Sequence, residues 1–502
     1  MAESSKNSLY QQPKGLYLLC GTELWERFGF YTVQAILILY LTKSLGYTDN
    51  KANLIYAVYS SLLYITPMIG GYIADRFLGF QRAILIGGIL SVLGYLITAV
   101  TGEHLFFIGL SILICANGLF KPNVSAIVGD LYQADDARRD GGFTLFYMGI
   151  NIGALVPPVI AGVMVKWYGW HTGFLLAAIG MIIGFITFLI GKRRLTLAGK
   201  IPQNSPVAQL GVKRWRFEGM FYLGFAVLSG LTFYAFQFPQ QITYLVEAAA
   251  VAIALVVIYL MFKESTYDRK RILASLILTA ISVGFWALYN QTFTSLTLFA
   301  DRNMQQRFLG IPVNAEAMQF FNPLYIILLS PLLSRFWMSL GRRGLNPSIP
   351  LKFTLGVLFL GLGFLILPLG IHFFPNQGNV AASWLVLSYL FQTIGELLLS
   401  PVGLSMITML VPKRLVGMMM GVWFFAQAAS FALGGSLANL ADIPDNLTKL
   451  QSLAVYNHAF LLFGLLSVGL VIVSFGLIPF LKKLTGQPSA NIQPDTKQLI
   501  TN

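Results

Sequence analysis

Two carboxylates and an arginine lie inside an apolar segment, in the run Glu23-Leu24-Trp25-Glu26-Arg27-Phe28-Gly29-Phe30-Tyr31. An ionised side chain inside a bilayer costs roughly 2.5–3.5 kcal/mol, and it is retained where it faces a cavity, pairs with another charge or handles ions. At helical spacing, Glu23, Arg27 and Gln34 share one face. Glu26 and Tyr31 flank that face. We therefore expect a membrane helix whose polar face carries function.

The composition predicts an all-α integral membrane protein. Of the 502 residues, 56% are hydrophobic and only 11% are charged, and the mean hydropathy is +0.69. A span needs about 20 apolar residues. Fourteen segments meet or approach that length, at roughly 14–42, 52–76, 82–100, 104–128, 142–165, 170–191, 217–237, 242–262, 272–299, 316–338, 350–371, 380–410, 414–441 and 455–481.

The net charge of +14 reports topology and not a nucleic-acid partner. The basic clusters all fall on one side of the predicted spans: Lys192-Arg193-Arg194, residues 213–216, Arg269-Lys270-Arg271 and Arg342-Arg343. Loops rich in Lys and Arg stay in the cytoplasm. The chain is therefore predicted to be a multi-pass plasma (inner) membrane protein with both termini cytoplasmic, its first span an uncleaved anchor, and the lipid bilayer its surroundings.

The spans divide into two halves. The longest polar connector, 192–216, contains Pro202 and Pro206 and is predicted to be a cytoplasmic linker. It separates an N-terminal six-helix bundle (1–191) from an extra helical hairpin (217–262), a C-terminal six-helix bundle (263–482) and a cytoplasmic tail (483–502). Six-span repeats are typical of alternating-access transporters, whose substrate site lies between the halves near the membrane midplane.

A weak internal repeat supports this division. The stretch 70–79 contains Asp75 and Arg76 and is followed by Arg82, and Ser334 to Arg343 occupies the matching place in the second half. These three residues are candidates for a conformational latch between helix ends. A basic loop at the membrane edge is the alternative interpretation.

Two further ionisable residues lie deep in predicted spans. Lys121 precedes Pro122, and Glu396 lies shortly before Pro401, so both prolines predict breaks in their helices. A cavity-facing Lys121 is favoured over an ammonium that reaches the cytoplasmic edge. Glu396 has no nearby partner in the sequence, so a ligand cation, a proton or a distant base is expected to satisfy it. An interhelical salt bridge is the alternative.

Buried amides and aromatic residues recur beside these charges. The amides can bind a ligand or join helices, and the sequence does not decide between these roles. The amides are Asn151, Asn290 and Asn322, and the aromatic residues are Tyr31, Tyr64, Trp286, Tyr289 and Trp423. Several aromatic residues beside polar groups suit a varied organic substrate.

Opposite charges in the two halves favour a zwitterionic substrate. Arg27 and Lys121 are cationic and belong to the first half, whereas Glu396 is anionic and belongs to the second. Successive Cα atoms lie about 3.8 Å apart, so a dipeptide or tripeptide matches such a separation. Glu23 and Glu26 beside Arg27 offer a site for a coupling proton.

Other chemistry has little support in the sequence. Cys20 and Cys115 lie in spans and predict no disulfide, and neither a metal nor a cofactor other than protons is expected. No nucleophile and base are spaced for catalysis, so the chain is not predicted to be an enzyme. His104, His171, His372 and His458 fall at span edges or in loops, which disfavours a histidine proton relay in the core.

Several motifs also resemble a known family. Glu23-x-x-Glu26-Arg27-Phe28-x-Phe30-Tyr31 is similar to the E-x-x-E-R-F-x-Y-Y motif of proton-dependent oligopeptide transporters, within the major facilitator superfamily. Phe120-Lys121-Pro122-Asn123 and Phe146-Tyr147-x-x-Ile150-Asn151-x-Gly153 resemble two more of its motifs. The resemblance runs from about residue 14 to 482, and the regions of Trp286 and Glu396 look closest to the bacterial dipeptide and tripeptide permeases.

The resemblance implies a role for each candidate residue. Arg27, Lys121 and Tyr31 would bind the peptide carboxylate, and Glu396, Asn151 and Asn322 would hold its amino terminus. Tyr64 and Trp423 would line side-chain pockets, and Glu23 and Glu26 would couple the proton through Arg27 and Lys121. Gln34 stands where many members have arginine, and Asn290 falls about where many have an acid. These departures leave open which carboxylate carries the proton and how the outer gate is held.

The prediction is a monomeric proton–peptide symporter for dipeptides and tripeptides. A relative that carries another small organic anion or a drug-like solute is the alternative, although Glu396 would repel a simple anion. A peptide-sensing receptor that does not transport is a third possibility.

Overall fold

A computed structural model describes residues 11–133, 136, 138–195, 198–200, 214–373, 378–444 and 446–485, without the side chains of 214–218 and 404. Pro202, Pro206 and nearly all of the predicted tail lie outside the described residues. Almost all of the described chain is helical, and its one sheet is the short hairpin of β1 (Arg307–Phe308) and β2 (Ile311–Pro312).

The first half begins with α2, which packs against three later helices, α6, α7 and α8. Its elements are α2 (Lys14–Leu39), η1 (Tyr40–Ser44), α3 (Asp49–Ile73), η2 (Ala74–Leu78), α4 (Phe80–Thr98), α5 (Glu103–Asp130), α6 (Arg139–Leu155), α7 (Pro157–Tyr168), α8 (Trp170–Gly191) and η3 (Lys192–Leu195). α4 packs against α5 and α8, and α3 packs against α5.

The second half is built around α14, which packs against α15 and α17. Its elements are α11 (Thr266–Tyr289), η5 (Asn290–Thr292), α12 (Ser295–Asn303), η6 (Glu316–Phe320), α13 (Phe321–Arg342), α14 (Ile349–His372), α15 (Ala382–Leu410), η7 (Lys413–Leu415), α16 (Val416–Ala438), η8 (Asn439–Ala441) and α17 (Lys449–Thr485). His458, predicted at a span edge, lies in the third turn of α17.

The predicted all-α membrane fold is confirmed. Twelve helices within the described residues are long and apolar enough to cross a membrane. α2 and α9 (Arg214–Ala235) complete the fourteen predicted spans. The charges of α2 make it less apolar than the twelve, and the described apolar part of α9, Gly219–Ala235, is shorter.

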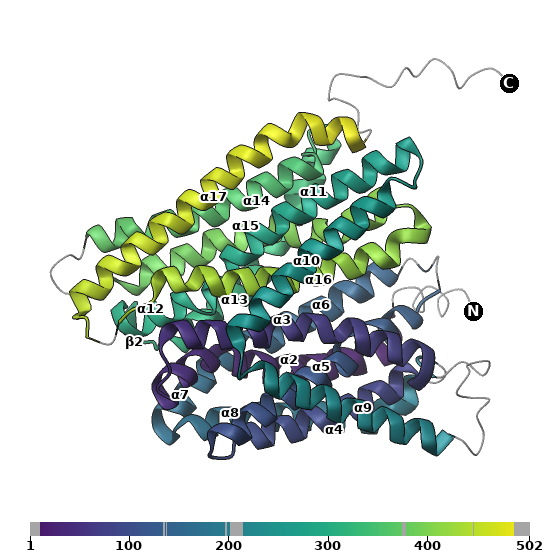
Figure 1. Ribbon diagram of the computed structural model, residues 1–502, viewed down its shortest axis with the longest axis horizontal. Helices are drawn as coiled ribbons and strands as arrows, with labels where there is room; N and C mark the ends of the chain where they lie inside the picture. Colours follow the sequence, from purple (N-terminus) through teal and green to yellow (C-terminus); the bar gives the residue numbers. More distant parts are fainter. Residues whose placement is uncertain are drawn as a thin grey trace.

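Figure 1 shows α2 to α8 in one layer and α11 to α17 in a second. The predicted extra hairpin consists of α9 and α10 (Pro239–Met261). α9 packs against α5, whereas α10 contacts both α3 in the first layer and α16 in the second. Only four residues of α10 are buried, Thr243, Val246, Val257 and Met261, as expected for a helix that faces lipid on most of its surface.

The two predicted proline breaks are wrong. α5 continues through Pro122 and α15 continues through Pro401. Pro122 has no N–H to donate to the carbonyl of Gly118, and Gly70 of α3 packs directly against that carbonyl, where a Cβ would overlap it. Neighbouring helices stabilise a membrane helix across a proline in this way.

Two of the predicted spans cross as expected, but each contains a break between two helices. The segment 142–165 changes direction between α6 and α7 at Val156, before Pro157 and Pro158. Two consecutive residues without N–H groups favour a new helix start at that point. The segment 272–299 ends its α-helix at Tyr289, passes through η5 and resumes as α12.

Candidate binding cavity

Arg27 is held between the two glutamates of its own helix. Its Nε lies 2.5 Å from Oε2 of Glu26 and 3.3 Å from Oε1 of Glu23. Its Nη2 donates a 2.6 Å hydrogen bond to Oε1 of Glu26. The three side chains are almost fully buried, and the guanidinium lies 4.5 Å from the centre of the Phe30 ring. Oε2 of Glu23 is buried without a hydrogen-bond partner in the described chain.

Lys121 of α5 faces the same cavity as Arg27 and does not extend to the membrane edge. Its Nζ lies 5.1 Å from the centre of the Tyr64 ring and 5.9 Å from that of Phe30. It lies close enough to both glutamates for electrostatic interaction. Among the described residues, no carboxylate forms an ion pair with Lys121, so its ammonium remains available to a ligand.

Glu396 of α15 is hydrogen-bonded by neutral groups. The Tyr289 hydroxyl donates to its Oε2 at 2.6 Å, and Nδ2 of Asn322 donates to the same oxygen at 2.8 Å. Nδ2 of Asn322 also lies 2.7 Å from the Tyr289 hydroxyl and 3.1 Å from Oγ1 of Thr393. No basic side chain within the described ranges pairs with Glu396, so the alternative of an interhelical salt bridge is not what the structure shows.

One cavity of about 330 Å³ lies between the two halves and contains both sets of charges. It is lined by all the residues predicted to contact substrate, which are Arg27, Tyr31, Gln34, Tyr64, Lys121, Asn151, Trp286, Asn290, Asn322, Glu396 and Trp423. Glu23 lines it as well, and Glu26 adjoins it through Arg27. Cationic groups on α2 and α5 therefore share a space with a carboxylate on α15.

Several polar atoms of the cavity wall lack partners in the described part of the chain. They include Nε1 of Trp286, Nδ2 of Asn290 and Oε1 of Gln34. Buried polar groups are normally hydrogen-bonded, so such atoms indicate a place where a polar ligand is received. Asn151 differs, because its Nδ2 donates at 2.9 Å to the Tyr147 carbonyl of its own helix.

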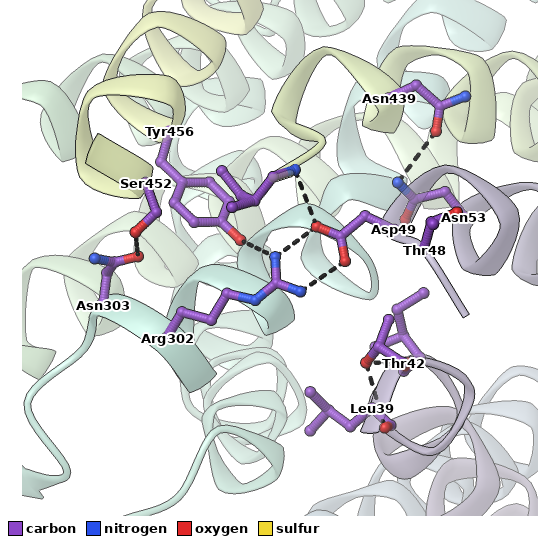
Figure 2. A network of polar contacts seen from close by, with 12 residues as sticks. Leu39, Thr42, Thr48, Asp49, Asn53, Arg302, Asn303, Asn439, Ser452 and Tyr456 are labelled. Atoms are coloured by element: carbon purple, nitrogen blue, oxygen red, sulfur yellow. Dashed lines mark hydrogen bonds and ion pairs between the residues drawn. The ribbon is translucent and has the colours of Figure 1, made fainter. Parts of the chain in front are cut away.

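An ion pair joins the two halves at the end opposite the basic loops. Figure 2 shows Arg302 of α12 against Asp49 at the start of α3, with Nη1–Oδ2 and Nη2–Oδ1 distances of 2.5 and 2.6 Å. The Tyr456 hydroxyl lies 3.1 Å from Nη1, and the Ile443 N–H donates to Asp49. The geometry is bidentate, which is the strongest arrangement of an arginine and a carboxylate.

Two further contacts close the same end. Nδ2 of Asn53 donates to Oδ1 of Asn439 at 3.3 Å (Figure 2), and Nζ of Lys43 lies 2.5 Å from Oδ1 of Asp301. The sequence reasoning missed these residues. Charges at span ends are ordinary in membrane proteins, and a single sequence does not indicate which of them pair.

The predicted latch residues lie away from this end. Asp75 and Arg76 are exposed in η2, and the Arg76 guanidinium lies 5.7 Å from the Tyr72 ring. Neither forms an ion pair within the described residues. Arg82 is half-buried in the first turn of α4. Their latch role stays a prediction.

Residues 81–454 match the model of the POT family. The chain belongs to the POT family. It is 34% identical over 495 residues to dipeptide and tripeptide permease B of Salmonella typhimurium, and the alignment covers 97% of this chain and 99% of that protein. Membership makes this chain a multi-pass transporter of the inner membrane with the major facilitator fold, as its sequence predicts.

Solved structures of POT family members superpose closely on this chain. A mutant of peptide transporter POT in complex with alafosfalin has a TM-score of 0.82 and 34% identity, over 95% of this chain and 96% of that one. A POT family transporter in complex with 5-aminolevulinic acid has a TM-score of 0.81 and 30% identity, over 94% and 97%.

Proposed function

We propose that this chain imports dipeptides and tripeptides by alternating access, coupled to inward movement of protons. The observation that carries the proposal is the single cavity in which Arg27 and Lys121 face Glu396. A peptide has a carboxylate at one end and an ammonium at the other, so it matches both walls at once. The relatedness to dipeptide and tripeptide permeases supports the same substrate class.

Each charged residue takes a role that follows from its contacts. Arg27 and Lys121, with Tyr31, bind the peptide carboxylate, and Glu396 receives the ammonium together with Asn151 and Asn322. Gln34, Trp286 and Asn290 offer unpartnered polar atoms to the peptide backbone. Tyr64 and Trp423 supply aromatic surface for its side chains.

The coupling follows from the sum of charges. With every group ionised, Glu23, Glu26, Arg27 and Lys121 sum to zero. One proton on either glutamate gives this group a charge of +1, which matches the peptide carboxylate. Glu396 is negative and matches the peptide ammonium. A cavity that holds one proton and one peptide is therefore neutral, whereas a cavity without them has a net charge of −1.

The protein is proposed to act as a monomer, with both termini in the cytoplasm, since the basic loops lie on the side of the termini. The Asp49–Arg302 end then faces outward. Closure at that end corresponds to a state in which the cavity is sealed from the outside.

Uptake of labelled dialanine into proteoliposomes with an inward proton gradient tests the proposal. Accumulation that a protonophore abolishes is the expected result. No uptake by folded, correctly inserted protein would exclude the peptide substrate. Competition between dialanine and small organic anions separates this function from the alternative of another small solute. A related POT family transporter is in complex with 5-aminolevulinic acid, which supports testing this alternative.

A further inference from the structure

A second cavity lies at the end of the molecule that carries the basic loops, outside the peptide cavity. It has a volume of about 640 Å³ and is formed where η2, the start of α4 and η3, which follows α8, meet. Four cationic side chains line it: Arg82, Lys192, Arg193 and Lys200. Leu78 and Leu85 form its apolar wall, and none of the described residues that line it is acidic.

The positive charge of this cavity is not neutralised by its own segment. Residues 192–217 contain no Asp or Glu at all, whereas they contain seven Lys and Arg residues. Within the described residues, Lys192, Arg193 and Lys200 form no ion pair. Clustered like charges repel one another, so an arrangement of this kind is stabilised by an anion between them.

Hydrogen bonds from Gln81 hold the segment 198–200 against the start of α4 and so shape this cavity. The Gln81 N–H donates to the Gly199 carbonyl at 3.0 Å, and Nε2 of Gln81 donates to the Ala198 carbonyl at 2.6 Å. Gly199 is buried with a φ of +72°, and a Cβ there would crowd Ile127. These bonds hold Lys200 beside the first turn of α4, where the positive end of the helix dipole adds to the field.

The surface next to the cavity is apolar and faces outward. From Leu85, exposed apolar residues continue along α4 at Ile89, Leu93 and Leu96, which share one helical face. α8 packs against α4 and exposes Ile183, Ile186 and Ile190. Both helices lie in the outer part of the first layer (Figure 1). A phosphate in the cavity is thus adjacent to a surface suited to acyl chains.

We infer that this cavity binds the phosphate group of an anionic glycerophospholipid from the cytoplasmic leaflet, with its acyl chains along α4 and α8. A basic pocket between membrane helices on the cytoplasmic side is a recognised type of lipid headgroup site. A free inorganic phosphate has the same anionic group but no acyl chains to contact the apolar surface. The inference concerns a site apart from peptide transport and does not depend on it.

The test compares phosphatidylglycerol with phosphatidylcholine on the full-length protein in detergent, by native mass spectrometry. The variant Lys192→Gln/Lys200→Gln removes two charges from the cavity. The control variant Lys482→Gln/Lys483→Gln removes two charges from the end of α17, at the same side of the molecule. A single symmetric peak in size-exclusion chromatography shows that each protein is folded, which keeps the test independent of peptide transport.

The expected result is one retained phosphatidylglycerol on the wild type, at least fivefold less on the cavity variant and a change of less than twofold on the control. Retention that excess inorganic phosphate does not displace identifies the lipid as the ligand. Equal retention by wild type and cavity variant overturns the inference, as does an equal loss in the control variant. Displacement by inorganic phosphate overturns it in favour of a free-anion site.

Discussion

The Tyr289 hydroxyl donates a 2.6 Å hydrogen bond to Oε2 of Glu396. This contact fixes the carboxylate from α11 while leaving it without a basic partner in the described chain. Neutral donors orient a charge without cancelling it, so Glu396 keeps its full attraction for a ligand ammonium. These hydrogen bonds offset part of the cost of burying a carboxylate in the second half of the cavity.

Replacing Glu396 with glutamine removes the charge and keeps the shape. A hydrogen bond to a charged group contributes about 1.5–3 kcal/mol, so affinity for free dipeptides is expected to fall by about 10- to 100-fold. N-acetylated dipeptides lack the ammonium and are expected to lose less than threefold. Competition for dialanine uptake measures both, with Thr393→Val as a control that retains the carboxylate. Equal losses for the two peptide classes would contradict the assigned role.

Lys121→Ala is expected to abolish peptide accumulation, because it removes the one ammonium that faces the peptide carboxylate in the described cavity. The matched control is Lys352→Ala, since Lys352 is also half-buried and lies 4.7 Å from an aromatic ring, that of Trp337. Uptake by the control is expected to remain within twofold of wild type. Wild-type accumulation in Lys121→Ala would remove Lys121 from the binding site.

Glu23→Gln and Glu26→Gln are expected to separate transport from the proton gradient. Each substitution fixes the neutral form of one carboxylate beside Arg27, as protonation would. Accumulation driven by a pH gradient is expected to fall at least tenfold in one or both, while exchange of labelled for unlabelled dialanine across the membrane continues. If pH-driven accumulation were unchanged in both variants, the proton would bind elsewhere.

Asp49→Asn and Arg302→Gln are each expected to slow uptake severalfold, because each leaves the opposite charge unpaired at a cost of about 1–3 kcal/mol. The loss of uptake rate in the double variant, expressed as a free energy, is expected to be smaller than the sum of the losses in the two single variants. Initial uptake rates of the four proteins form a double-mutant cycle. Lys43→Gln is the control, since the Lys43 side chain is 50% exposed and such pairs contribute little. Strict additivity in the cycle would show that the pair does not act as a unit.

The sequence predicts the fold and the cavity residues well because ionised groups in apolar segments are conspicuous. Burying Arg27, Lys121 or Glu396 in lipid costs free energy, so these side chains are expected to face a shared cavity. The pairing of Tyr289 with Glu396 was not predictable in the same way. It depends on the rotation of α11 against α15, where the Phe285 ring packs against Gly395.

The missed and mistaken elements have a common physical cause. Proline normally interrupts a helix, yet at Pro122 the freed Gly118 carbonyl is covered by a glycine from another helix. Asp49 and Arg302 lie 253 positions apart, and only tertiary packing brings them into contact. Local sequence patterns do not predict such tertiary contacts, whereas they do predict the length and polarity of each span.

The isolation of Glu396 among neutral donors also has a consequence for the membrane voltage. In the proposed cycle the loaded cavity is neutral, so its inward movement is insensitive to voltage. The empty cavity retains one negative charge, and a potential that is negative inside pushes this charge outward. One charge across 100 mV corresponds to about 2.3 kcal/mol, which permits roughly fiftyfold accumulation. Voltage therefore acts on the return of the empty carrier, and the peptide is carried inward on the neutral step.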